Sequence, residues 1–137
     1  MDIAIEQPAR ARLITGEERE LLVLAQLRYA STDPLAVHLD FPGEVSLDGH
    51  GATWTFARSL LEGGLRGPAG DGDVHIWPCG PERTVVELHS PYGMALLQFD
   101  TSALNRFLLR TYAVVATGEE DLGAVVERGL SSLFGGV

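Results

Sequence analysis

The sequence predicts an α+β domain with two packed antiparallel β-sheets of about seven strands, one short inserted helix and two C-terminal helices. Three observations support this fold class. Apolar and polar residues alternate with a period of two through the first half of the chain, as in strands with one buried face. Short turn signals separate the runs, which favours antiparallel neighbours. From residue 104 onward the apolar spacing changes to that of a helix.

Four alternating runs fill the first half of the chain. They cover residues 3–13, 21–29, 35–41 and 53–56. Pro8 lies inside the first run, so we expect an edge or a bulge there, because proline cannot donate to a ladder. Residues 31–34 are a turn signal between the second and third runs. A short extra strand at residues 45–47 is an open alternative for the loop before the fourth run.

One short helix interrupts the strands. Its pattern covers residues 57–65 and ends at Gly63-Gly64 and Gly67-Pro68. The remaining strands are expected at residues 74–77, 84–88 and 94–99. Ser90-Pro91-Tyr92-Gly93 predicts the hairpin turn between the last two.

The tail predicts two helices. The first apolar stripe runs from Leu104 to Val115, and a cleaner one runs from Leu122 to Phe134. Residues 117–120 resemble a capping box that opens the last helix. We interpret the last stripe as core packing on the protein's own sheet, although Gly129 would allow another backbone to approach closely. Because no repeat and no linker interrupts residues 1–137, we expect a single domain.

Charge and composition exclude several classes of site and make some partners unfavourable. The formal net charge is -9, and the ten basic residues are all arginine. Without lysine, Schiff-base catalysis and a phosphate-loop lysine are excluded. The excess of carboxylates opposes binding to a phosphate backbone. The single cysteine, Cys79, cannot form an internal disulfide, and neither a signal peptide nor a membrane span is expected, so a cytoplasmic protein is predicted.

Metal chemistry has a weak signal in the histidines. His38, His75 and His89 each fall on the polar phase of a strand, so sheet pairing can bring two of them together on one face. No two histidines have the helical i, i+4 spacing of zinc enzymes. We interpret them as solvated side chains and predict no metal site, with metal ligands or pH-sensitive contacts as the alternatives.

A catalytic apparatus is not predicted, and no cofactor is expected. The glycine-rich loop at residues 67–73 follows a helix and precedes a strand, the wrong order for a phosphate or dinucleotide loop. We interpret it as a turn with positive φ at glycine. Ser59 and Ser90 lie outside any nucleophile elbow, and nothing around Cys79 predicts a reactive thiol. The chain is therefore predicted not to be an enzyme.

Nucleic-acid binding is the alternative that the side chains keep open. Six arginine and aromatic residues are of the types that stack bases on a sheet surface: Arg28, Tyr29, Trp54, Arg58, Arg66 and Trp77. Trp54 shares its phase with Phe56, which predicts a core position. Trp77 is out of phase with Val74 and Ile76, so we expect it to be exposed or at an interface. The negative charge makes this the minority interpretation.

Four blocks of sequence resemble the SsgA-like sporulation and cell division proteins of actinomycete bacteria. They are Leu27-Arg28-Tyr29 with Asp33-Pro34-Leu35-Ala36-Val37-His38; Trp54-Thr55-Phe56-Ala57-Arg58 with Leu60-Leu61; Gly70 with Gly72-Asp73-Val74 and Trp77-Pro78; and Leu88 with Ser90-Pro91, Gly93 and Ala95-Leu96-Leu97. Phe107-Leu108 and Arg110-Thr111 continue the match, so that it spans residues 27–111 in order and spacing. Within the family the chain looks most similar to the SsgB type.

The resemblance implies a function that the residues alone do not give. It implies a Whirly-like fold, self-assembly with a trimer favoured, and no catalytic residues. The implied role is to control sporulation-specific cell division, by placing or activating the tubulin-like division GTPase FtsZ at septum sites. Other SsgA-like proteins are further implied partners, and recruitment from the cytoplasm to the division septum is implied as well.

Exposed aromatic and arginine side chains anchor most protein interfaces. On that ground we predict Arg28, Arg66, Trp77 and Tyr92 as partner-binding residues. The alternative function is a single-stranded nucleic-acid-binding protein of Whirly-like fold.

Overall fold

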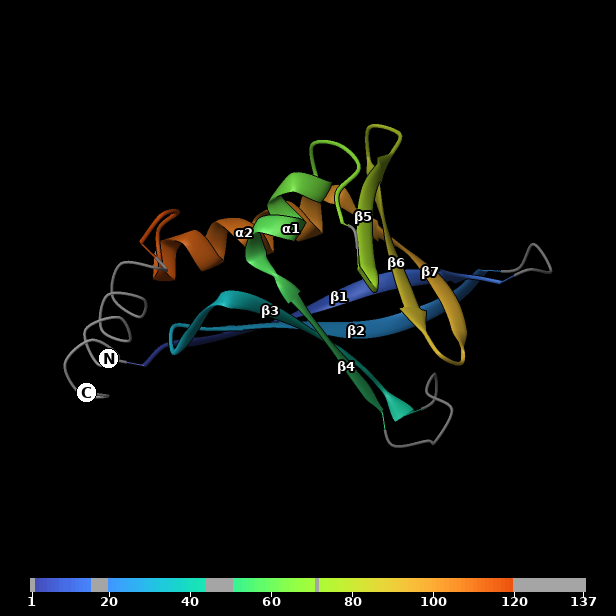
Figure 1. The fold of residues 1–137 in the computed structure, drawn as a ribbon, viewed down its shortest axis with the longest axis horizontal. Coiled ribbons are helices and arrows are strands. Elements are labelled where there is room, and N and C mark those ends of the chain that lie inside the picture. Colours follow the sequence, from blue (N-terminus) through green and yellow to red (C-terminus); the bar gives the residue numbers. More distant parts are fainter. Residues whose placement is uncertain (1, 16–19, 44–50, 71, 120–137) are drawn as a thin grey trace, which may run out of the picture.

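The computed structural model describes residues 2–15, 20–43, 51–70 and 72–119. Seven strands and two helices follow one another along the chain (Figure 1). Their bounds are β1 Ala4–Ile14, β2 Glu20–Ala30, β3 Asp33–Phe41, β4 Ala52–Ala57, α1 Arg58–Gly64, β5 Val74–Cys79, β6 Arg83–Ser90, β7 Gly93–Asp100 and α2 Thr101–Val114. The fold is therefore mostly antiparallel β, as the alternating runs predict.

The strands form one continuous sheet, which corrects the expectation of two packed sheets. Its order is β4-β3-β2-β1-β7-β6-β5, and every neighbouring pair is antiparallel. β1 pairs with β2 over its whole length but with β7 only from Ala11 to Ile14. This short ladder joins two arms, β1–β4 and β5–β7, which run in clearly different directions in Figure 1. The two layers expected from the sequence are these arms of one curled sheet.

Pro8 lies where the sheet tolerates it. It belongs to the part of β1 that pairs with β2 alone, because the ladder to β7 begins at Ala11. A proline on an unpaired strand edge leaves no ladder hydrogen bond unmade. The edge interpretation of Pro8 is confirmed.

The core lies in the angle between the two arms. α1 contacts β3, β4 and β5, whereas α2 contacts β1 and β7, so both helices fill the concave side of the curled sheet (Figure 1). Every second residue of β1 from Ile5 to Ala11, and of β2 from Val23 to Tyr29, is buried beneath them. A single apolar cluster contains residues of both arms and both helices. The described chain thus folds around one core.

Close packing fixes the end of α1. A Cβ placed on Gly64 would lie 2.3 Å from Cγ2 of Ile76, so only glycine lets the helix approach β5 this closely. Gly70 in the following loop has φ +113, and a Cβ there would lie 2.4 Å from the carbonyl oxygen of Val74. The helix end at Gly63-Gly64 and the positive-φ interpretation of the loop are both confirmed.

The remaining sequence predictions are either confirmed by the structure or fall on residues that it does not describe. The hairpin turn is confirmed, since Ser90 pairs with Gly93, whose φ is +139. The first C-terminal helix is α2. The extra strand at residues 45–47 and the helix from Leu122 to Phe134 lie outside the described residues. Among the helices of the described segments, none is long and apolar enough to cross a bilayer.

Candidate interaction surfaces

A buried arginine ties α1 to the end of α2. The Arg58 side chain is 3% exposed, and its Nη1 donates to the carbonyl oxygens of Thr111 at 3.2 Å and Val115 at 2.6 Å. Its guanidinium carbon lies 5.2 Å from the ring centroid of Tyr29 and 4.8 Å from that of Tyr112. We call these five residues the arginine junction. It joins β2, α1 and α2 through one cation.

The arginine junction removes two residues from the predicted nucleic-acid surface. Tyr29 is 1% exposed, and its hydroxyl donates to the carbonyl oxygen of Pro34 at 2.9 Å. Arg58 is equally inaccessible, so neither side chain can stack on a base. The expectation that these two residues could form a stacking surface is wrong. Trp54 packs half-buried against the core, as its phase with Phe56 predicts.

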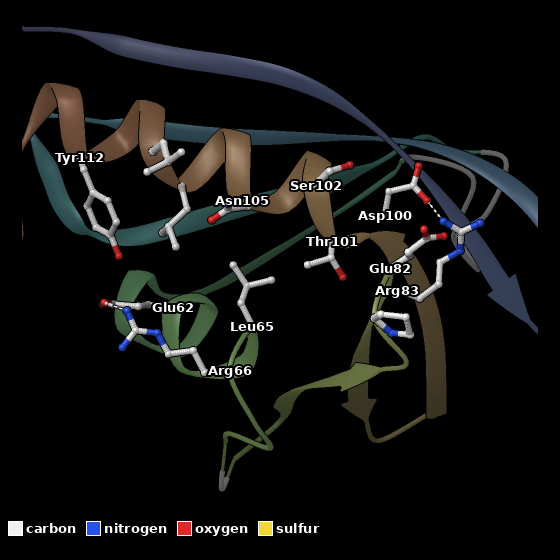
Figure 2. Close-up of a pocket in the computed structure, with 13 residues that line it drawn as sticks. Glu62, Leu65, Arg66, Glu82, Arg83, Asp100, Thr101, Ser102, Asn105 and Tyr112 are labelled. Carbon is white, nitrogen blue, oxygen red and sulfur yellow. Dashed lines mark hydrogen bonds and ion pairs between the residues drawn. The ribbon is translucent and has the colours of Figure 1, made fainter.

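A polar cleft of about 720 Å³ opens between α1, α2 and the β5–β6 turn (Figure 2). Its walls are Glu62, Leu65, Arg66, Pro81, Glu82, Arg83, Asp100, Thr101, Ser102, Asn105, Leu108, Leu109 and Tyr112. Arg66 lies 3.5 Å from Glu62 one helical turn away, and Arg83 forms an ion pair with Asp100. The cleft therefore presents paired charges rather than one sign of charge.

Tyr112 gives this cleft a buried hydroxyl. Among the described residues the hydroxyl has no partner within hydrogen-bond distance. Burial raises the pKa of Tyr112, and the nearby Glu62 carboxylate raises it further. The phenol therefore stays protonated, with its hydroxyl buried beside the Glu62 carboxylate.

An apolar groove of about 730 Å³ lies at the other junction of the two arms. Its walls are Leu13, Val23, Phe41, Gly51, Ala52, Trp54, Leu88, Ser90, Tyr92, Gly93, Met94, Ala95 and Leu97. Tyr92 is 85% exposed and Met94 is 55% exposed at its rim, on the β6–β7 hairpin. Large apolar side chains left in water around a concavity are typical of a site that another molecule covers.

The four residues predicted to bind a partner do not form one surface. Tyr92 lines the apolar groove, and Arg66 lines the polar cleft with its side chain 81% exposed. Trp77 is half-buried on the outer face of β5, opposite Val85. Arg28 makes an ion pair with Asp40 on the neighbouring strand, with Nη2 3.0 Å from Oδ1. Tyr92 and Arg66 are thus the accessible members of the set.

The Arg28 ion pair has an electrostatic signature. The hydrogen bond from Arg28 lowers the pKa of Asp40, and a second one from Thr53 at 2.6 Å also favours the ionised carboxylate. Arg28 is therefore already engaged within the sheet, as a structural role requires.

Sequence reasoning missed an exposed apolar pair on β2. Leu22 is 80% exposed and Leu24 is 63% exposed, and they face Arg12 and Arg10 across the ladder to β1. Both occupy the outward phase of a strand whose inward phase is already apolar. The sequence does carry a signal for this pair, because residues 21–25 are all apolar instead of alternating with polar residues.

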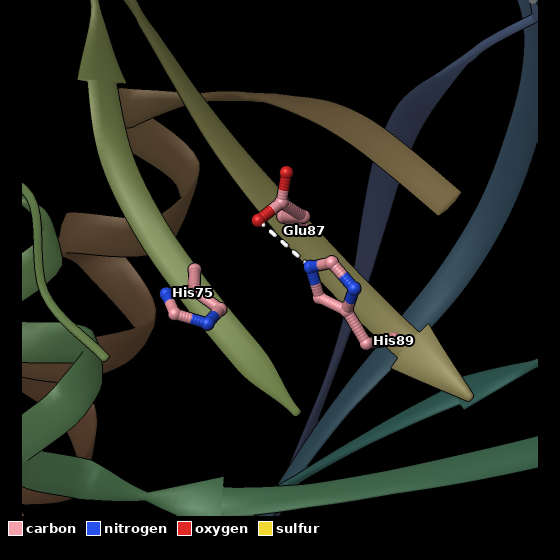
Figure 3. A group of neighbouring side chains, drawn as sticks. All are labelled: His75, Glu87 and His89. Carbon is pink, nitrogen blue, oxygen red and sulfur yellow. Dashed lines mark ion pairs between the residues drawn. The ribbon is translucent and has the colours of Figure 1, made fainter. Parts of the chain in front are cut away.

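Sheet pairing brings two of the histidines together, as their phase allows. His75 on β5 and His89 on β6 meet with ring centroids 5.6 Å apart, beside Glu87 (Figure 3). These three residues are the group of possible metal ligands in the described segments. His38 lies on β3, away from this group, with its Nδ1 2.8 Å from the hydroxyl oxygen of Thr55. Cys79 is exposed, and the Ser90 hydroxyl accepts a hydrogen bond from the Tyr92 amide within its own turn.

The family profile for "Streptomyces sporulation and cell division protein, SsgA" matches residues 23–120. The sporulation-specific cell division protein SsgB of Salinispora tropica is 42% identical, over 96% of this chain and 94% of that protein. SsgB of Streptomyces coelicolor is 38% identical, over 98% of each chain. These matches extend over nearly the whole fold described above.

A solved structure agrees with the sequence matches. It comes from work relating mutations in SsgB to longitudinal cell division during sporulation of Streptomyces coelicolor, and it superimposes with a TM-score of 0.77. Its sequence identity is 40%, covering 88% of this chain and 93% of the other. The curled seven-stranded sheet with its two helices is therefore shared with a relative of high sequence similarity.

Proposed function

The chain belongs to the SsgA family of sporulation and cell division proteins, and we propose that it works as a non-enzymatic adaptor within it. Its role is in sporulation-specific cell division, the role that its SsgB relatives are named for. The adaptor would promote septum-site placement or activation of FtsZ, the partner that the family resemblance implies. It would be recruited from the cytoplasm to the septum for this purpose.

The apolar groove is the observation that carries the adaptor proposal. Tyr92 and Met94 are exposed at its rim, and Trp54 is half-buried in its wall. Covering such side chains releases water without leaving a charge unpaired, so it favours association. Aromatic residues and methionine are enriched at protein interfaces for this reason. A partner's apolar segment is the chemistry that this groove would accept.

The polar cleft would supply a second contact and orient the partner. Arg66 lies in the turn after α1, and among the described residues its one ion pair is with Glu62 of that helix, so a partner carboxylate can replace Glu62. Charged rim contacts contribute more to orientation and association rate than to affinity.

Self-association, with a trimer favoured by the family resemblance, would use a different surface. Leu22 and Leu24 are exposed on the outer face of β2, away from both concavities. Burying them against a second copy would remove about 25 cal/mol of unfavourable free energy for each Å² covered. We also propose that the fold is Whirly-like, as the family resemblance implies.

A binding measurement with purified FtsZ tests the adaptor. We expect saturable binding by the full chain in biolayer interferometry, and loss of affinity in Tyr92→Ala with Met94→Ala. Leu35→Ala is the matched control, because Leu35 is 46% exposed but lines neither concavity. Affinity that is the same in all three proteins would exclude the apolar groove as the binding site.

A pull-down from sporulating lysate separates the adaptor from the nucleic-acid alternative. With nuclease treatment, recovery of FtsZ and septum proteins supports the adaptor. Recovery that depends on intact nucleic acid, together with binding that falls steeply with salt, would favour the single-stranded nucleic-acid-binding function instead.

A further inference from the structure

Three side chains with metal-ligand chemistry lie on the outer face of the β5–β6 ladder (Figure 3). His75 is the register partner of Glu87, and His89 follows Glu87 by two residues on the same face of β6. His89 Nε2 lies 2.9 Å from Glu87 Oε2. One ligand atom from each of the three residues lies within 4.8 Å of the other two.

The strand pairing holds these side chains in place before any ligand arrives. The ladder runs without a register shift from Val74 to Cys79, and it is extended by the bond from the His89 amide to the Asp73 carbonyl oxygen at 2.8 Å. On the opposite face Ile76 is fully buried, which fixes the rotation of β5. Only side-chain rotation is therefore needed to adjust the three ligand atoms.

The spacing is close to what a tetrahedral ion requires. With zinc–ligand bonds of about 2.0–2.1 Å, two ligands of a tetrahedron lie about 3.4 Å apart. The His89–Glu87 pair is already slightly closer than this, and the widest separation in the group, 4.8 Å at most, must shorten. The two imidazole rings meet edge to face, with an angle of 74° between their planes, so neither ring is stacked flat against the other.

The donor set selects the kind of ion. Two imidazole nitrogens and one carboxylate oxygen suit zinc and its neighbours in the first transition row, whereas calcium and magnesium prefer all-oxygen sites. Three protein ligands leave one tetrahedral position for water. An ion pair between Glu87 and His89 explains their own contact but not the presence of His75 beside them.

We propose that His75, Glu87 and His89 form a binding site for a zinc-type divalent cation. The bound ion clips β5, the edge strand of its arm, to β6. This site is separate from both the apolar groove and the polar cleft, so the inference does not depend on the proposed adaptor function. It differs from the sequence interpretation of these histidines as independent solvated side chains.

Calorimetric titration of the chelator-treated full chain with zinc chloride tests the site. We expect one zinc ion per chain. Mutating even the groups that support metal ligands weakens metal affinity by about 10–100-fold, so His75→Ala and His89→Ala should each weaken it by at least that much. Glu87→Gln should weaken it in the same direction.

Two matched variants serve as controls. His38→Ala removes a histidine that lies 3.5 Å from a carboxylate, Asp33, but has no second histidine beside it in the described segments. Cys79→Ser removes an exposed thiol on β5, the strand that carries His75. Both should bind zinc as the unmodified chain does. Binding that survives His75→Ala and His89→Ala, or that is lost in a control, would overturn the proposal, as would no saturable binding at all.

A measurement on the unmodified chain avoids dependence on how the variants fold. Zinc should shift the imidazole NMR resonances of His75 and His89 and leave those of His38 in place. It should also raise the unfolding temperature, because a ligand that binds only the folded state stabilises it. Shifts confined to His38 or His50 would overturn the site.

Discussion

The arginine junction buries a charged side chain, whereas the apolar groove leaves large apolar side chains exposed. In the junction a charged side chain, Arg58, is 3% exposed and donates to two backbone carbonyl groups between two aromatic rings. At the groove an aromatic side chain, Tyr92, is 85% exposed. Buried polar groups and exposed large apolar groups are the informative exceptions in a globular protein.

This difference indicates that the arginine junction has a structural role and the apolar groove a binding role. Every interaction of Arg58 is internal, so the junction can only fix how α1, α2 and β2 meet. Tyr92 and Met94 contribute little to the core, so their exposure is unexplained unless another molecule covers them. Substitutions at the junction should therefore change stability, whereas substitutions at the groove should change binding.

The largest effect is expected at the junction itself. Arg58→Ala should lower the free energy of unfolding by about 3 kcal/mol, because it removes the Arg58 donor to the Val115 carbonyl oxygen and one of two donors to the Thr111 carbonyl oxygen, and it opens a cavity. Urea denaturation followed by circular dichroism measures this change. Arg66→Ala, in the exposed turn that follows the same helix, is the control and should change stability by less than about 0.5 kcal/mol. Equal losses in both variants would refute the structural assignment of Arg58.

The next effect is expected at the groove. Tyr92→Ala with Met94→Ala should weaken partner binding by about 2 kcal/mol, the size of an interface hot spot, or roughly 30-fold in Kd. The free energy of unfolding should stay within about 0.5 kcal/mol, because both side chains are largely exposed. Binding and denaturation curves on the same preparations measure the two quantities. A matched loss of both would make these residues structural.

An intermediate effect is expected where a polar pair is only half-buried. Asp40→Asn removes the ion pair with Arg28 and should cost about 0.5–1 kcal/mol at neutral pH. Because the pKa of Asp40 is lowered in the folded state, its contribution is present above the unfolded pKa of about 3.9 and disappears as the pH falls through the folded value. Stability measured from neutral to strongly acidic pH should therefore fall more in the unmodified chain than in Asp40→Asn. Parallel curves would contradict this.

The smallest effect is expected in the polar cleft. Arg66→Ala should weaken partner binding by no more than about 1 kcal/mol, since exposed charge pairs rarely contribute more. The loss should shrink at high salt, where exposed charges are screened. Binding measured at low and high ionic strength distinguishes this electrostatic contact from a packing contact, which salt would not diminish.

Much of the sheet could be predicted because alternation records which face of a strand is buried. The inward phases of β1 and β2 agree with the structure, and so does the edge position of Pro8. The burial of Arg58 also had a signal, because it shares its phase with the buried Phe56. By its residue type alone, Arg58 was instead grouped with the arginine and aromatic side chains that can stack on bases.

The single sheet could not be predicted in the same way. It depends on the pairing of Ala11 with Phe99, two residues far apart in the sequence, and alternation gives no register across that separation. The two concavities follow from this junction of the arms. Tyr92 was predicted as an anchor from its residue type, whereas its neighbours in the groove come from strands that only the fold brings together.

The separation of a structural junction from a binding groove is tested by comparing FtsZ binding and thermal unfolding in three preparations of the full chain. They are the unmodified chain, Tyr92→Ala with Met94→Ala, and Arg58→Ala studied below its unfolding temperature. We predict weakened binding with an unchanged unfolding temperature in the groove variant, and a lowered unfolding temperature with retained binding in the junction variant. Binding that follows the unfolding temperature across all three preparations would contradict it.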